Sequence, residues 1–190
     1  MLPTMRKIIL GILLLWTLGS SAQSQMSQVL RQMPATVIPY LSENNKLDMI
    51  DFMDSKMKAE VHNMLEGKSE LTKLTDSYAA LSLTPATQVA IRLLDVEVPV
   101  DSASQILCVV STYGVDVRDS QIDFYSLNWR KLEASSFITL PDGMFTASID
   151  EQQPLLTLTT SAALNYPASE EQEKLAERLT TFKWDNKRFK

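Results

Sequence analysis

The chain has 190 residues, with 18 lysine and arginine residues against 23 aspartate and glutamate residues, and a net charge of −5 at pH 7. This acidic balance argues against nucleic acid and anionic lipid as main partners, because both are bound largely through clustered basic side chains. A single cysteine, Cys108, excludes an internal disulfide, so an apolar core must stabilise the fold.

The N-terminus has the layout of a secretory signal peptide. Arg6 and Lys7 precede an apolar run, residues 8–18, and a small-residue segment that ends at Ala22. The apolar run is shorter than the roughly 20 residues that a membrane-spanning helix needs. We therefore predict cleavage after Ala22, which lowers the net charge from −5 to −7 by removing two basic residues. The mature chain, residues 23–190, is then a single exported domain; an uncleaved N-terminal anchor is the alternative.

The longest predicted element is a helix over residues 43–66, with Ser42 as its N-cap and Gly67 as its stop. On a helical projection its apolar side chains share one methionine-rich arc. The arc contains Leu47, Met49, Ile50, Met53, Met57, Val61, Met64 and Leu65. Phe52 falls outside the arc, and residues 60–75 also fit a strand. A second packing surface on the helix, or a break near Ser55 with a strand before Gly67, therefore remains open.

From residue 68 the apolar period changes to two, which is the strand signal. Residues 76–83 and 88–94 predict a hairpin. Residues 105–114 are apolar on both faces and therefore predict a central strand, with Cys108 as a buried small hydrophobe. Residues 119–129 are predicted to return beside that central strand.

The C-terminal third predicts further strands and one helix. Residues 137–149 hold two alternating runs around a Pro-Asp-Gly turn, and residues 155–164 form another strand. A short helix is predicted over residues 169–179, followed by a closing strand over residues 179–189. The predicted fold is α+β, with an N-terminal amphipathic helix packed on a mostly antiparallel, hairpin-connected β-sheet.

Asp48, Asp51 and Asp54 are the candidate metal or acid residues, together with His62. Helical rotation spreads the three carboxylates over about 120°, so a single helix cannot direct them all at one ion. The plainer interpretation is a solvated helix face. Asp54 lies at the apolar border, where a carboxylate needs a hydrogen-bond partner or a basic side chain.

Other catalytic patterns are missing from the sequence. His62 is the only histidine, and there is no G-x-S-x-G nucleophile elbow. One histidine and one cysteine leave too few of the usual zinc ligands. The sequence therefore predicts no catalytic residues, no cofactor and no metal site, and it favours a protein that is not an enzyme.

Several phrases resemble a family of uncharacterised exported proteins from Bacteroidetes bacteria. The strongest is "NNKLDMIDFMD", and the likeness continues through "GKSELTKLTDSYAALSL", "LCVVSTYG", "DSQIDFYS" and "FKWDNKRF". It spans nearly the whole mature chain. The family carries a domain-of-unknown-function label and no assigned catalytic residues. The resemblance therefore implies export to a Gram-negative periplasm or outer surface, but no mechanism.

Two functional hypotheses remain. The first is a non-catalytic module that binds another protein or a cell-envelope component, with self-association also open. The second is a carboxylate- or metal-dependent hydrolase that uses the helix of Asp48, Asp51 and Asp54. The hydrolase hypothesis requires at least two acidic or histidine side chains to converge in one concave pocket. The candidates are Asp48, Asp51, Asp54, Glu60 and His62.

Overall fold

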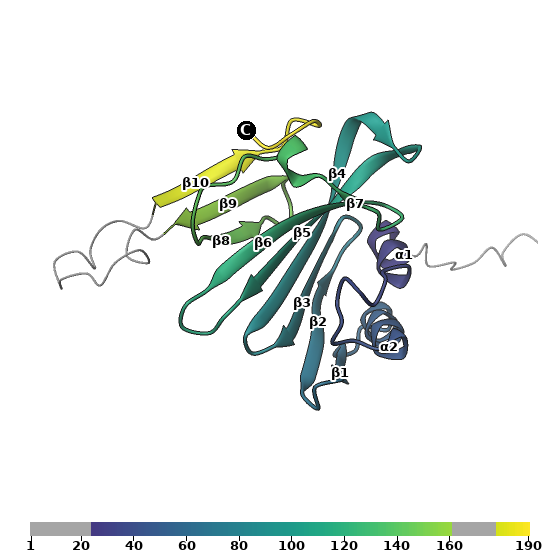
Figure 1. Cartoon of the computed structure of the whole chain (residues 1–190). Coiled ribbons are helices and arrows are strands. Elements are labelled where there is room, and N and C mark those ends of the chain that lie inside the picture. Colours follow the sequence, from purple (N-terminus) through teal and green to yellow (C-terminus); the bar gives the residue numbers. More distant parts are fainter. Residues whose placement is uncertain (1–23, 161–177) are drawn as a thin grey trace, which may run out of the picture.

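The computed structural model describes residues 24–160 and 178–190, which form two short helices and two antiparallel sheets (Figure 1). The helices are α1 (Gln25–Arg31) and α2 (Glu43–Asp54). The larger sheet contains β1 (Glu60–His62), β2 (Lys68–Leu74), β3 (Tyr78–Thr84), β4 (Thr87–Val100), β5 (Ala103–Tyr113), β6 (Asp119–Ser126) and β7 (Lys131–Leu132). The smaller sheet contains β8 (Thr146–Ile149), β9 (Leu155–Thr160) and β10 (Arg178–Lys183). Within these residues, no helix is long and apolar enough to cross a bilayer.

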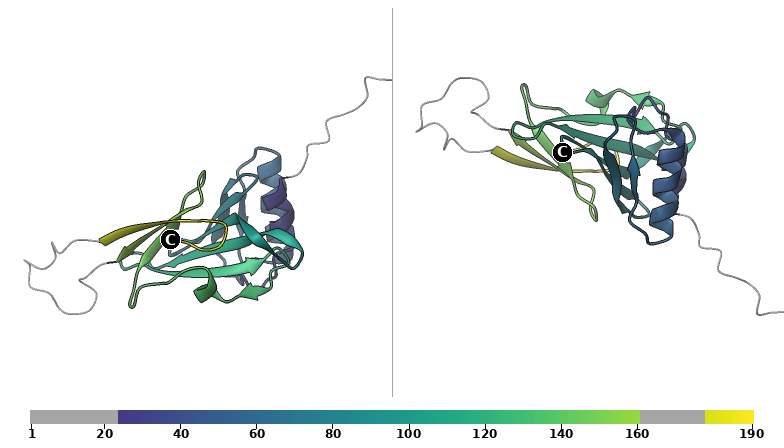
Figure 2. Two further views of the ribbon diagram at one scale, coloured as in Figure 1. Left: turned by 90° about the horizontal axis from the view of Figure 1, so that it is seen from above. Right: turned by 90° about the horizontal axis from the view of Figure 1, so that it is seen from below.

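The seven-stranded sheet is a meander in which each strand pairs with the one before it. The three-stranded sheet has the order β10-β9-β8, so β8 and β10 are its edge strands. The helices and the smaller sheet lie on opposite sides of the larger sheet (Figures 1 and 2). Because side chains alternate between the faces of a strand, this arrangement creates two separate apolar cores.

β5 shows the division between the cores. Leu107 and Val109 belong to the first core, which includes side chains of α1 and α2, while Ile106 and Cys108 belong to the second, beside the smaller sheet. All four are 3% exposed or less. The predicted central strand is thus confirmed, and so is the buried state of Cys108. Burial raises the pKa of the Cys108 thiol, which keeps it protonated.

The predicted α+β fold with a long N-terminal amphipathic helix was wrong, because the described protein is mostly β-sheet and its helices are short. α2 ends at Asp54 in a Schellman-type turn. Lys56 adopts a left-handed conformation (φ 58°), and the N–H of Met57 donates to the carbonyl oxygen of Phe52 over 2.8 Å. This turn usually requires glycine, so a lysine there gave no sequence signal for the helix end.

The second half of the predicted helix instead contains β1 and the turn that leads to its partner strand β2. Asn63 orders its turn, since the side-chain oxygen accepts hydrogen bonds from the N–H groups of Leu65 and Gly67. Met49 is buried in the first core and Met53 packs against it, but Met57 and Met64 are 58% and 66% exposed, so only the first half of the methionine stripe contributes to a core. The alternative that was left open, an early helix end with a strand before Gly67, is the structure that is found.

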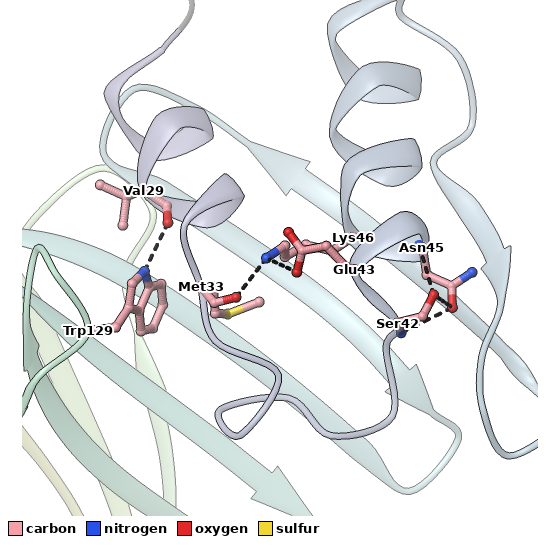
Figure 3. Close-up of polar contacts among 7 residues, drawn as sticks. All are labelled: Val29, Met33, Ser42, Glu43, Asn45, Lys46 and Trp129. Atoms are coloured by element: carbon pink, nitrogen blue, oxygen red, sulfur yellow. Dashed lines mark hydrogen bonds and ion pairs between the residues drawn. The ribbon is translucent and has the colours of Figure 1, made fainter.

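Buried polar contacts hold the helical segment (Figure 3). Ser42 caps α2 through a reciprocal pair of hydrogen bonds with Asn45. The ammonium group of Lys46, 6% exposed, donates to the carbonyl oxygen of Met33 over 2.7 Å and pairs with Glu43 over 2.8 Å. Trp129 reaches α1 from the end of β6. Its indole N–H donates to the carbonyl oxygen of Val29 over 2.9 Å, which connects residues far apart in the sequence.

The remaining sequence predictions have mixed outcomes. The hairpin of residues 76–83 and 88–94 is confirmed as β3 and β4, and the returning strand as β6. Of the two runs in residues 137–149, only the second forms a strand, β8. The first instead closes a 3-10 turn, η2 (Ala134–Ser136), through hydrogen bonds to the carbonyl oxygen of Ala134. The predicted helix over residues 169–179 lies almost wholly outside the described residues.

Candidate functional site

The predicted aspartates lie on the exposed side of α2. Arg31 donates to Asp51 over 2.6 Å and lies 3.5 Å from Asp54, so Asp54 has the basic partner that its position required. Asp48 is exposed on α2, and His62 is exposed on β1. In residues 24–160 and 178–190, no three His, Cys, Asp or Glu side chains are grouped as metal ligands. The structure therefore brings Asp51 and Asp54 together only as two surface carboxylates that pair with Arg31.

A groove of about 310 Å³ lies on the second-core face of the larger sheet, between β2–β5 and β8. We call it the alanine groove, because small side chains form its floor. Its lining residues are Thr72, Tyr78, Ala80, Leu81, Ser82, Gln88, Val89, Ala90, Val110, Thr112, Ala147, Ser148 and Ile149. Its volume lies at the lower end of the roughly 300–1,000 Å³ typical of ligand pockets.

The strand register explains the floor of the groove. Ala80 on β3 lies opposite Ala90 on β4, and Ala90 lies opposite Val110 on β5. Residues opposite one another in an antiparallel pair point to the same face, so these side chains form one row. Ala80 and Ala90 contribute only methyl groups to this row, where most sheets carry larger side chains. The groove is deep because these side chains are small.

Polar side chains form the next row of the same face. Ser82, Gln88, Thr112 and Ser120 lie opposite one another across β3 to β6. The hydroxyl oxygens of Thr112 and Ser120 are 2.8 Å apart, within hydrogen-bond distance. The Ser120 oxygen also accepts a hydrogen bond from the N–H of Ala147 over 2.9 Å. This row therefore supplies hydroxyl and amide groups to the groove and attaches one end of β8.

Arg92 attaches the other end of the β8 wall. It stands on β4 between Tyr78 and Cys108 and is 6% exposed. Its guanidinium donates to three backbone oxygens of the β8–β9 turn, those of residues 150, 151 and 152, over 2.6–3.1 Å. Lys73 adds an ion pair with Glu151 at 2.8 Å. Arg92 and Lys73 at the turn, and Ser120 at the other end, thus fix the wall over the floor.

The chemistry of the groove suits binding. None of the residues that line it is charged, and the lining contains no histidine, cysteine or carboxylate that could activate a hydroxyl nucleophile. Burial, together with the charges of Glu151 and Asp150, raises the pKa of the Tyr78 hydroxyl. Tyr78 therefore remains a neutral hydrogen-bond donor. The groove offers hydroxyl groups, one amide and small apolar surfaces to an uncharged ligand.

A second cavity, of about 300 Å³, lies against β9 and β10. Thr160 and Arg178 form part of its lining, and they flank residues 161–177, which are outside the described residues. The alanine groove is therefore the better defined of the two cavities.

Sequence reasoning missed the groove entirely. Ala80 and Ala90 were assigned to strands, yet nothing in their neighbourhood marks them as a binding floor. Their effect depends on register, which places them opposite one another, and on β8, which is more than 50 residues away along the chain.

Comparisons with known proteins identify the family of the chain and a similar fold. The family model described as "Protein of unknown function (DUF3256)" matches residues 17–154. Among solved structures, the chain is similar to a domain of an uncharacterized protein from Porphyromonas gingivalis W83, with a TM-score of 0.74 and 19% sequence identity. That match covers 88% of this chain and 98% of the other, and it supports the fold alone. A comparison with curated proteins gave no match.

Proposed function

The chain belongs to the DUF3256 family of proteins of unknown function, and from this premise we propose that it is an exported, non-catalytic binding domain whose ligand occupies the alanine groove. The supporting observation is the groove's lining of neutral hydroxyl, amide and methyl groups beneath a wall fixed at both ends. The partner is an uncharged part of a protein or of the cell envelope. The hydrolase hypothesis has no comparable support, because Asp51 and Asp54 are ion-paired with Arg31 and line neither cavity.

Filling the groove tests the binding function. Ala90→Trp places an indole on the floor, and Ser104→Trp adds the same side chain at an exposed position of β5 outside the groove. Mature wild-type protein and both variants are immobilised and exposed to solubilised envelope extract. We expect wild type and Ser104→Trp to retain a common ligand, identified by mass spectrometry, that Ala90→Trp does not retain. Equal retention by all three proteins would refute binding in the groove.

Export is tested by the mass of the processed protein. When the full chain is expressed in a Gram-negative host, we expect a periplasmic species that begins at Gln23, because Ala22 ends the small-residue segment. Intact-mass spectrometry of the periplasmic fraction measures the cleavage site. An Ala22→Arg variant is the control, since a large charged residue at the cut should block processing. A wild-type product that keeps residues 1–22 would contradict cleavage.

A further inference from the structure

The outer edge of β8 faces the alanine groove. β8 is the last strand of the order β10-β9-β8, so its second edge has no neighbouring strand in the smaller sheet. The N–H of Asp150 donates inward to the carbonyl oxygen of Leu155, whereas the N–H of Ala147 points outward and donates to Ser120. Backbone groups of an antiparallel strand alternate in direction, so those of Ile149 also point outward. Ala147, Ser148 and Ile149 all line the groove.

The dimensions of this edge fit a short extended chain. β8 has four residues, and a strand rises about 3.3 Å per residue, so the edge is roughly 13 Å long. The methyl groups of Ala80 and Ala90 lie beneath the space beside it. Small floor residues are what a peptide backbone needs for close approach.

Polar side chains on either side of the alanine floor offer matching groups. Ser82, Gln88 and Thr112 present hydroxyl and amide groups in one row, and Tyr78 presents a neutral hydroxyl. The charges at the turn end are engaged elsewhere, because Lys73 pairs with Glu151 and the Arg92 guanidinium donates to the backbone of the β8–β9 turn. The site therefore selects an uncharged segment. An oligosaccharide is the weaker fit, because sugar rings are usually held on aromatic faces and Tyr78 is the single aromatic residue in the lining.

We propose that the groove binds a neutral, extended peptide segment of about three to four residues, which pairs with the outer edge of β8 as an additional strand. This inference rests on the proposed binding function and specifies its ligand class. Because the Ala147 N–H already donates to Ser120, the peptide pairs with the carbonyl oxygen of Ala147 and with the N–H and carbonyl groups of Ile149. These backbone hydrogen bonds supply the affinity, so binding tolerates many neutral sequences. The row of Ser82, Gln88 and Thr112 then discriminates among the peptide side chains that face the floor.

The test uses three probes with the mature protein. The first is an end-capped, fluorescent hexapeptide of alternating threonine and valine. The second is the same peptide with N-methyl groups at alternate residues, which removes backbone donors but keeps the side chains. The third is a fluorescent hexamer of N-acetylglucosamine. We expect saturable anisotropy changes with the first peptide alone, a loss of about tenfold or more in affinity on N-methylation, and slower hydrogen exchange of the Ile149 amide.

Variants locate the site. Ala90→Trp should weaken peptide binding by about tenfold or more, and Ser104→Trp should leave it unchanged. Ala80→Leu provides a second, smaller obstruction if Ala90→Trp lowers the thermal unfolding midpoint. Equal binding of the N-methylated peptide, an unaffected Ala80→Leu variant, or no peptide binding at about 1 mM would overturn the inference. Binding of the sugar probe alone would overturn it while leaving a groove-binding function intact.

Discussion

At the residue scale, Asp185 shows how one carboxylate orders the C-terminal turn. It accepts hydrogen bonds from the N–H groups of Lys187 and Arg188 and pairs with the ammonium of Lys190. The turn brings Trp184 against Phe189, with ring centroids 5.0 Å apart, and both rings are buried in the second core. The Lys190 contact, followed by the backbone donor of Arg188, lowers the pKa of Asp185 from 3.8 to about 2.

This lowered pKa predicts a pH-dependent contribution to folding. A carboxylate with a lower pKa in the folded state stabilises the fold above its unfolded pKa and loses that contribution as pH falls through the folded pKa. We expect the unfolding free energies of wild type and Asp185→Asn to differ near neutral pH and to converge between about pH 4 and pH 2. Urea unfolding across this range measures the difference.

The control for this prediction is Lys190→Gln, which removes the largest cause of the shift but leaves the backbone donors. It should move the pH at which the contribution is lost upward, toward 3.8. A wild-type to Asp185→Asn difference that stays constant from neutral pH to about 2 would show that ionisation of Asp185 is not responsible.

At the element scale, the β8–β9 hairpin depends on a buried cation. Arg92 satisfies three backbone oxygens at once, although its Nε has no hydrogen-bond partner among the described residues. Burial lowers the pKa of Arg92, opposed by the charge of Asp150. A guanidinium suits this position because its planar fork directs several donors at neighbouring oxygens, which a single ammonium group cannot do.

Replacement of Arg92 by lysine should therefore lower the free energy of unfolding more than replacement by an uncharged residue does. We expect Arg92→Lys to lower the unfolding free energy by about 3 kcal/mol, because the buried ammonium loses partners that it needs. Arg92→Met should cost less, about 1–2 kcal/mol, since no buried charge remains. Urea unfolding measures both values, and exchange of the Ala147 amide reports loosening of β8. An Arg92→Lys variant as stable as wild type would contradict the claim that this position needs a planar guanidinium.

The sequence predicted the elements with clear periodicity. The doubly apolar run of residues 105–114, the alternation in residues 119–129 and the neighbouring hairpin located β3 to β6, because those strands bury one or both faces. The helix of residues 43–66 was wrong because its end depends on the left-handed backbone of Lys56, a residue type that rarely marks such a turn. The alanine groove was out of reach, since it needs the register of Ala80 with Ala90 and the distant wall at Ile149.

At the scale of the whole molecule, the C-terminal residues complete the second core. Trp184 and Phe189 pack with Phe124 and Phe137, and the Trp184 indole donates to the carbonyl oxygen of Asp95 over 2.6 Å. The family model ends at residue 154, before β9 and β10 begin. The region shared through that model therefore includes β8 but lacks β9, which pairs with it, and β10, which pairs with β9.

A chain that ends at residue 154 should fail to fold cooperatively. Without β9 and β10, β8 has no partner in its sheet, and Phe124 and Ile122 lose most of their cover. We expect residues 23–154 to bind a hydrophobic dye strongly and to melt without a sharp transition by circular dichroism, whereas residues 23–190 melt cooperatively. A cooperative transition of the shorter chain at the same temperature would contradict this dependence.

The meander of the larger sheet also bears on how the chain assembles as it is made from its N-terminus to its C-terminus. Each new strand from β2 to β7 finds its partner in the segment made just before it, so pairing requires only short loops to close. The smaller sheet has to wait for β10, the last strand to appear. During this interval the apolar second-core face of the nascent sheet is uncovered. This is the period in which the protein is most vulnerable to aggregation or to capture by a chaperone.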